Sequence, residues 1–381
     1  MPESEVYGSV SPATGGSSSP LPSELEQLTT MLSSKSSKEV LEHYLGLNKL
    51  QAVSPVAENM IVVCFDTESW TNDHNKITEV GVSTFDSRDM RVVKEAGPYS
   101  ENLLKQVYFY HARILENAHL LNIKYCVGNP DTQVISPSSQ PTSADRMISN
   151  RFGQTRFLTR PEACGMLTEM IAWPIDERQP ELGFCPVVVM GHALNGDISM
   201  LKNTLGFNSA SLGSVVKCGY AARSHNQIGL RNLVGSCGFS YRDPHTASND
   251  AAMTLICALQ MILPAALKPS STPLQRVVDE VELASRAQKW TWGNDMYCLR
   301  CGEYGHTKNN FRGRRCSKKI CCMHCRNAKV EKRIKAASTH RTECCITYAR
   351  SGGSVLSSTV ADWMLGVEGL EVVKLKPGEW W

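Results

Sequence analysis

The sequence predicts an α/β fold, with a mixed sheet flanked by helices, joined to a small zinc-binding module. Continuous apolar runs at 60–65 (MIVVCF) and 186–190 (PVVVM) are typical of strands buried on both faces. Segments with apolar residues at helical spacing alternate with these runs. Eight of the 15 cysteines lie between Cys298 and Cys345, which indicates a separate metal-binding segment.

The first 56 residues predict a flexible tail followed by short helices. Residues 1–22 are rich in Ser, Pro and Gly and have neither the basic start nor the apolar core of a secretory signal. Residues 23–46 alternate apolar and charged positions at helical spacing. No apolar run approaches the roughly 18 residues that a membrane helix needs. We therefore expect an intracellular protein of the cytoplasm or the nucleus that binds no membrane.

The middle of the chain carries the pattern of an α/β domain. After the first buried strand we expect strands at 77–85 and 90–94 and a helix at about 101–117. The Pro, Ser and Asp residues of 125–156 predict a surface insertion. Further helices are expected at 160–173, 196–206 and 249–263, and a Pro/Ser-rich linker ending in an amphipathic helix at 264–289.

Charge changes sharply along the chain. Residues 298–350 contain 14 Lys/Arg and 3 Asp/Glu, a net charge of +11, although the whole chain carries +3. The remainder is therefore near −8. The predicted organisation is a tail with short helices at 1–56, an α/β domain at 57–268, a linker at 269–291, a basic zinc module at 292–350 and a tail at 351–381.

Carboxylates follow the predicted strands and begin the predicted helices. Asp66 and Glu68 come directly after the first buried strand, and the period of two puts them on one face. Asp197 lies in the first turn of the helix after the strand 186–190. His245 and Asp250 stand five apart where the long helix begins.

These five residues provide the functional groups that metal-dependent cleavage of a phosphodiester requires. The four carboxylates Asp66, Glu68, Asp197 and Asp250 would bind the metal, and His245 would act as a base. Taken singly, each residue also has a structural interpretation: Asp197 as a carboxylate favoured by the helix dipole, and His245 as a loop histidine. Their joint occurrence at strand ends and helix starts favours the catalytic interpretation.

The same residues resemble the motifs of the DEDDh 3′→5′ exonucleases. These enzymes carry D-x-E, then an Asp after a G-H-N-like turn, then H-x₄-D. FDTE at 65–68, GHALNGD at 191–197 and HTASND at 245–250 match in that order. More narrowly, FDTESW, ITEVGVSTFD, FGQTRF and GHALNGDI resemble the fungal exonuclease-like domain whose namesake is a yeast factor linked to mRNA export. The resemblance covers roughly 57–268.

The resemblance implies a ribonuclease H-like fold and exonuclease activity. It implies that the four carboxylates bind two Mg²⁺ or Mn²⁺ ions about 4 Å apart. Carboxylate oxygens are the ligands that such hard cations prefer. His245 would accept a proton from the attacking water, and its near-neutral pKa suits that role.

The cysteine-rich segment predicts one or two structural zinc sites. The first begins like a zinc knuckle, as Cys298-x₂-Cys301-x₄-His306. Phe311 stands where a knuckle would place its last cysteine, so we expect closure through Cys316. The expected second set is Cys322, Cys325, His340 and Cys344. Three alternatives remain open: Cys321 for Cys322, Cys345 for Cys344, and His324 as an unused neighbour.

The zinc segment also predicts a surface that holds nucleic acid. Tyr304 and Phe311 would stack on bases, or else fill the small core of the module. A basic run would engage phosphates, or else form a solvated surface. This run consists of Arg312, Arg314, Arg315, Lys318 and Lys319.

The sequence therefore predicts a metal-dependent 3′→5′ exonuclease on RNA or single-stranded DNA. The zinc module would help to bind the nucleic acid. One alternative is a nuclease fold of weak or lost activity that serves as an adaptor in RNA metabolism. Another is a module whose zinc part recruits protein partners.

Overall fold

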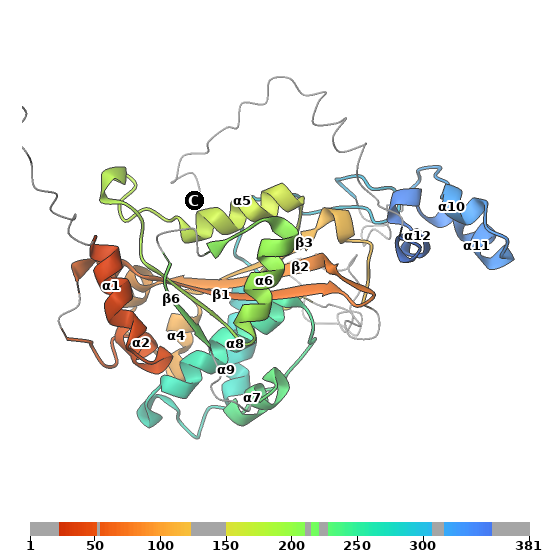
Figure 1. Cartoon of the computed structure of the whole chain (residues 1–381). Coiled ribbons are helices and arrows are strands. Elements are labelled where there is room, and N and C mark those ends of the chain that lie inside the picture. Colours follow the sequence, from red (N-terminus) through yellow and green to blue (C-terminus); the bar gives the residue numbers. More distant parts are fainter. Residues whose placement is uncertain are drawn as a thin grey trace, which may run out of the picture.

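The computed structural model describes residues 23–51, 54–122, 150–209, 215–220, 228–306 and 316–352. Within these residues a six-stranded sheet lies at the centre of the molecule, in the order β4-β3-β2-β1-β5-β6 (Figure 1). The strands are β1 (Ile61–Trp70), β2 (Asp73–Asp86), β3 (Tyr108–Ile114), β4 (Gln154–Leu158), β5 (Val187–Gly191) and β6 (Val215–Tyr220).

The sheet is mixed because β2 runs against the other strands. It pairs antiparallel with β1 and with β3, whereas β1 and β5, β3 and β4, and β5 and β6 pair in parallel. The carboxyl ends of β1 and β5 therefore meet at one edge of the sheet. The α/β fold with a mixed sheet and flanking helices is confirmed and is consistent with a ribonuclease H-like architecture.

Helices cover both faces of the sheet (Figure 1). One face packs against α5 (Arg160–Ile171) and α6 (Leu194–Leu205). The helices that contribute to the core on the other face are α1 (Glu24–Ser33), α2 (Ser37–Tyr44), α3 (Ser87–Val92), α4 (Glu101–Leu104), α7 (Leu230–Cys237), α8 (Ala247–Ile262) and α9 (Leu274–Ser285).

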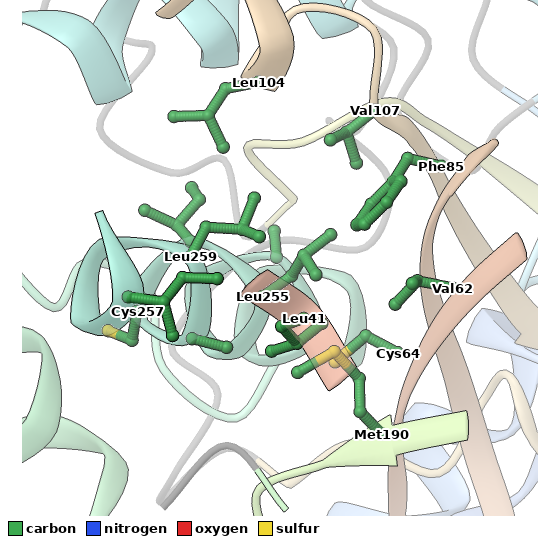
Figure 2. Close-up of a cluster of buried hydrophobic side chains, with 14 of the residues drawn as sticks. Leu41, Val62, Cys64, Phe85, Leu104, Val107, Met190, Leu255, Cys257 and Leu259 are labelled. Atoms are coloured by element: carbon green, nitrogen blue, oxygen red, sulfur yellow. The ribbon is translucent and has the colours of Figure 1, made fainter. Parts of the chain in front are cut away.

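Helix α8 lies at the centre of the apolar core on this second face of the sheet. Figure 2 shows Leu255 and Leu259 of α8 among side chains from other elements, including Leu41 and Phe85. The helix can approach the sheet closely because β2 has a glycine beneath its first turn. A Cβ atom on Gly81 would lie 2.1 Å from the carbonyl carbon of Ala247. Gly81 therefore sets the depth at which α8 begins.

Two predicted elements are wrong. The strand expected at 90–94 lies partly in the short helix α3, where the Asp86 side chain accepts a hydrogen bond from the Arg88 N–H and caps the first turn. The helix expected at 101–117 is three elements: α4, the strand β3 and a 3₁₀ turn. The β3 sequence YFYHARI is rich in aromatic residues, which favour a strand.

The segment 269–291, expected to be a linker, contains a helix that packs into the domain. Helix α9 buries Leu274, Val277 and Val281 in the core shared with α8. Of the predicted surface insertion 125–156, residues 125–149 lie outside the described chain. Its last residues are described, and Asn150 is buried there.

The cysteine-rich segment contains three short helices at one end of the molecule (Figure 1). They are α10 (Met323–Arg326), α11 (Glu331–Ala336) and α12 (Ile346–Arg350). Two small apolar clusters join this segment to the sheet domain. Ile346 and Ala349 pack on Trp70 and Leu120, and a second cluster brings Tyr297 and Leu299 against Leu115, Ala118 and Phe157. No helix in the described ranges has both the length and the apolar character needed to cross a membrane.

Candidate active site and metal centres

Asp66 and Glu68 lie near the carboxyl end of β1, between the neighbouring strands β2 and β5. The ladder between β1 and β2 is regular through Asp66 and breaks after Glu68, where the register shifts. Both side chains are half-buried. The strand therefore presents two carboxylates at the edge of the sheet where β5 also ends.

Asp197 reaches this edge from the first turn of α6. Its Oδ1 accepts hydrogen bonds from the Thr67 backbone N–H at 2.9 Å and from the Thr67 hydroxyl at 2.7 Å. Asp197 is buried, and these bonds fix it beside the D-x-E segment. The role of Thr67 could not be predicted from the sequence, because a residue inside D-x-E carries no signal of its own.

Asp250 and His245 come from the first turn of α8 and the loop before it. The Asp250 Oδ2 accepts hydrogen bonds from the Tyr241 hydroxyl at 3.2 Å and from the His245 N–H at 3.1 Å. The His245 Nδ1 lies 3.7 Å from Glu68 Oε1, and its side chain is 47% exposed. Ligand atoms of Glu68, His245 and Asp250 lie within 4.8 Å of one another.

The carboxylates repel one another in a buried setting. Burial and the charge of Asp250, followed by that of Asp197, raise the pKa of Asp66 well above its usual range. Burial and the nearby Glu68 raise the pKa of Asp250 to about 7. Burial raises the pKa of Asp197 to about 6 despite the Thr67 donors. Such a crowded group of negative charges favours a bound cation.

The donor atoms also fit a hard divalent cation. Asp250 Oδ1 is buried and has no hydrogen-bond partner in the described structure, so it is available as a ligand. The carboxylates offer only oxygen, which suits Mg²⁺ or Mn²⁺ and does not suit a thiophilic ion. All five residues expected from the sequence therefore lie at one edge of the sheet.

A buried polar network holds the start of α8 against the sheet. Glu79 of β2 accepts hydrogen bonds from the Ala247 N–H at 3.3 Å and lies 3.1 Å from His111 Nε2. The other ring nitrogen of His111 lies 2.8 Å from the Thr155 hydroxyl. The network continues through Asn150 to Ser248, whose hydroxyl donates to the Asn150 amide oxygen at 2.6 Å.

A second set of contacts fixes the loop that carries His245. Asp243 and His245 both have positive φ angles, 47° and 59°, which L-residues seldom adopt. The Arg151 side chain pairs with Asp243 and, at 3.1 Å, with Glu282 of α9. Its backbone N–H donates to Asn249 Oδ1 at 2.8 Å. These contacts could not be predicted from the sequence, because the residues come from segments far apart in the chain.

The first cysteine cluster has the expected members. Cys301 Sγ lies 3.2 Å from His306 Nε2, and Gly302 and Gly305 adopt positive φ angles that shape the loop between them. Ligand atoms within 4.8 Å of one another come from Cys298, Cys301, His306 and Cys316. Closure through Cys316, as expected, gives a Cys₃His set with the composition of a structural zinc site.

The second cluster differs from the expected set in one residue. It consists of Cys322, Cys325, His340 and Cys345. Cys325 Sγ lies 3.6 Å both from His340 Nε2 and from Cys345 Sγ. The expected ligand Cys344 is therefore replaced by its neighbour. A 3₁₀ turn ends at Cys344, whereas Cys345 is buried and caps α12, accepting the Tyr348 N–H.

Two arginines connect the clusters. Arg300 donates to the Lys318 carbonyl at 2.7 Å and to the Ser338 carbonyl at 3.1 Å. Arg341 donates from its side chain to the Cys301 carbonyl at 3.0 Å and from its backbone N–H to the Arg300 carbonyl at 3.1 Å. The loops that carry the two ligand sets therefore share hydrogen bonds.

The nucleic-acid residues expected from the sequence are only partly described. Tyr304 is 45% exposed, and its ring lies 5.8 Å from that of Tyr297. Lys318 pairs with Glu303 at 2.5 Å, and Lys319 is exposed. Four of the expected residues lie outside the described chain: Phe311, Arg312, Arg314 and Arg315.

Comparison with known proteins places this geometry in a family. Residues 61–261 match a DEDDh family model, which is described as "DNA polymerase III subunit epsilon-like, C-terminal domain". This stretch is more than half of the chain and contains all five site residues. No curated protein matches the chain. The narrower fungal resemblance and the zinc knuckle therefore remain predictions, and the chain belongs to the DEDDh exonuclease-like family.

Proposed function

We propose that this protein is a metal-dependent 3′→5′ exonuclease that acts on RNA or single-stranded DNA. The observation that carries the proposal is the group of buried and half-buried carboxylates on β1, α6 and α8, which have raised pKa values and a histidine beside them. The family supports a nuclease, and the complete set of carboxylates supports an active one.

Four carboxylates, from Asp66, Glu68, Asp197 and Asp250, would hold Mg²⁺ or Mn²⁺. The ions supply positive charge that stabilises the attacking and leaving oxygens of the phosphodiester. Thr67 orients Asp197, and Tyr241 orients Asp250. These bonds fix each carboxylate before substrate arrives, so little reorganisation is needed during the reaction.

His245 would accept a proton from the attacking water. The adjacent Glu68 carboxylate raises the pKa of His245, although burial opposes the shift. Because nearly half of its side chain is exposed, the imidazole can exchange that proton with solvent after each turnover. As the water oxygen bonds to phosphorus, the bond from phosphorus to the 3′ oxygen of the preceding nucleotide breaks and releases one nucleotide.

The Cys₃His clusters would bind structural zinc and shape a basic surface for the nucleic acid. The sets Cys298, Cys301, His306, Cys316 and Cys322, Cys325, His340, Cys345 provide the thiolate and imidazole ligands that zinc prefers. The surrounding segment has a net charge of +11, which suits a polyanion.

Degradation of 5′-end-labelled RNA and DNA, with and without Mg²⁺ or Mn²⁺, tests the proposal. We expect shortening from the 3′ end only when a divalent cation is present. Asp66→Asn should abolish cleavage and leave the fold intact, because the change removes a charge and no packed side chain. Asp176→Asn is a matched control, since Asp176 is not one of the site carboxylates and its side chain accepts hydrogen bonds within its own turn, from the Arg178 N–H and the Gln179 side-chain amide.

Two results would contradict the proposal. If Asp66→Asn cleaves like the natural protein, the assigned site is wrong. If the natural protein degrades none of the substrates with either cation, the nuclease fold serves as an adaptor.

A further inference from the structure

The second zinc cluster has a hollow on its surface that no catalytic residue lines. It lies between α10, α11 and α12, which Figure 1 shows together at one end of the molecule, and has a volume of about 410 Å³. This volume falls within the roughly 300–1,000 Å³ typical of ligand sites. The lining residues that matter here are Met323, His324, Asn327, Arg333, Thr342 and Tyr348.

One side of the hollow offers flat and apolar surfaces. The rings of His324 and Tyr348 lie 5.4 Å apart with an interplanar angle of 56°. Met323 also lines the hollow and is 51% exposed. A ring or a thioether in this position can contact the face of a planar ligand.

The hollow also carries polar groups that have no partner. The His324 Nε2 is buried and has no hydrogen-bond partner among the described residues. The exposed side-chain amide of Asn327 makes no hydrogen bond within the same part of the chain. An amide offers a donor and an acceptor side by side, which is the pattern that reads the edge of a nucleobase.

One basic residue in the lining, Arg333, and three basic residues close to the lining in sequence form no ion pair in the described structure. The three neighbours are Arg326, Lys329 and Lys332, and all four side chains are exposed. Lys335 on the same helix differs, because it pairs with Glu331 at 2.6 Å. None of the residues that line the hollow is acidic.

We propose that this hollow binds one unpaired base of a single-stranded nucleic acid, while Arg333 and the exposed cations that neighbour the lining in sequence hold the adjoining phosphates. The proposal rests on the nucleic-acid substrate of the proposed function and extends it to a second contact, distant in sequence from the carboxylates. Aromatic surface, a free amide and unpaired cations together match a nucleotide.

Binding can be measured without cleavage by using the Asp66→Asn protein as the background. The probes are a fluorescent oligouridylate and a strand of equal length in which the bases are replaced by abasic sites. Affinity is measured by fluorescence anisotropy over a series of salt concentrations. Zinc content and melting temperature are measured for each variant, so that any loss of folding is recognised.

We expect Asn327→Ala to weaken binding of oligouridylate about 5- to 50-fold, because it removes a base contact. The salt slope, which is the slope of the logarithm of affinity against the logarithm of salt concentration, should not change, because no charge is removed. Binding of the abasic strand should change less than about twofold. Arg333→Ala should weaken binding of both strands and reduce the salt slope by about one unit. Lys335→Ala is the matched control, with the same loss of charge outside the hollow, and its effect should be smaller.

The proposal is overturned if Asn327→Ala binds oligouridylate like its background, or loses affinity equally for both strands. The hollow would then fit a protein ligand. The degradation assay decides the proposed function separately. If the natural protein degrades no substrate but Asn327→Ala still weakens base-dependent binding, the exonuclease proposal is wrong and base binding in the hollow is supported. If the natural protein is active but Asn327→Ala leaves binding unchanged, the exonuclease proposal is supported and base binding in the hollow is wrong.

Discussion

The sheet domain and the zinc module hold their polar groups in place by different means. In the sheet domain, two large apolar clusters surround six strands, and a buried hydrogen-bond network that includes β2, β3, β4 and Asn150 fixes the start of α8. In the module, the cluster around the second ligand set contains only Cys322, Cys325, Ala337 and Cys345 as buried residues. Apolar burial therefore stabilises the sheet domain, whereas so small a core leads us to expect that the module depends on a bound metal.

The strongest test of this difference is removal of zinc. A strong zinc chelator should unfold 316–352 and leave the sheet folded, because structural zinc contributes about 10–16 kcal/mol to the folding of such modules. Hydrogen exchange should show loss of protection in α10 and α12 and retained protection in β1 and β5. Equal loss in both regions would mean that the domain also depends on the metal, and retained protection in both would mean that the module does not.

Gly81→Ala should have the next largest effect, and only in the sheet domain. The added methyl group would overlap the Ala247 backbone, so α8 must shift, at a cost of about 1–3 kcal/mol. Because α8 carries Asp250, cleavage should fall together with the melting temperature, and zinc content should stay unchanged. Gly235→Ala is the control: no atom lies within 4 Å of its Cβ position in α7, and alanine favours a helix by about 1 kcal/mol.

If Gly81→Ala leaves both melting and cleavage unchanged, the close approach of α8 does not position the site. If Gly235→Ala destabilises the protein equally, the loss of stability is not specific to the contact between Gly81 and α8.

Acid should weaken the sheet domain through Glu79. Burial alone would raise its pKa, but the neighbouring His111 and Arg113 lower the pKa of Glu79 to about 2. A carboxyl with a depressed folded pKa stabilises the protein above its unfolded pKa of about 4.5, and this contribution is lost as pH falls toward 2. The stability difference between the natural protein and Glu79→Gln should therefore be greatest near pH 7 and shrink below pH 4.5. Denaturant melts at several pH values measure it, and a constant difference would contradict the assignment.

The sequence predicted those parts of the molecule that have local signals. The apolar runs of β1 and β5 and the helical spacing of α5 and α8 gave their positions to within a few residues. β3 was missed, although its aromatic residues favour a strand, because the helix that begins at Glu101 was expected to continue across it. Spacing alone also allows either Cys344 or Cys345, since adjacent cysteines differ only in the turn that orients them.

The long-range contacts of the site had no such signal. His111, Asn150 and Ser248 belong to one network, although the chain separates His111 from Ser248 by more than one hundred residues. Only the fold brings these residues together. The motif residues were found because strand ends and helix starts meet at one edge of a parallel pair, which the order of elements already implies.

The arginine connections between the cysteine clusters have a consequence for metal loading. Arg300 and Arg341 each join a loop of one ligand set to a loop of the other. If both sets bind zinc, the first ion orders part of the second site, so the second ion binds with less loss of chain entropy. Linkage makes this effect reciprocal. The protein would then pass from empty to doubly loaded over a narrow range of zinc concentration, with few singly loaded molecules.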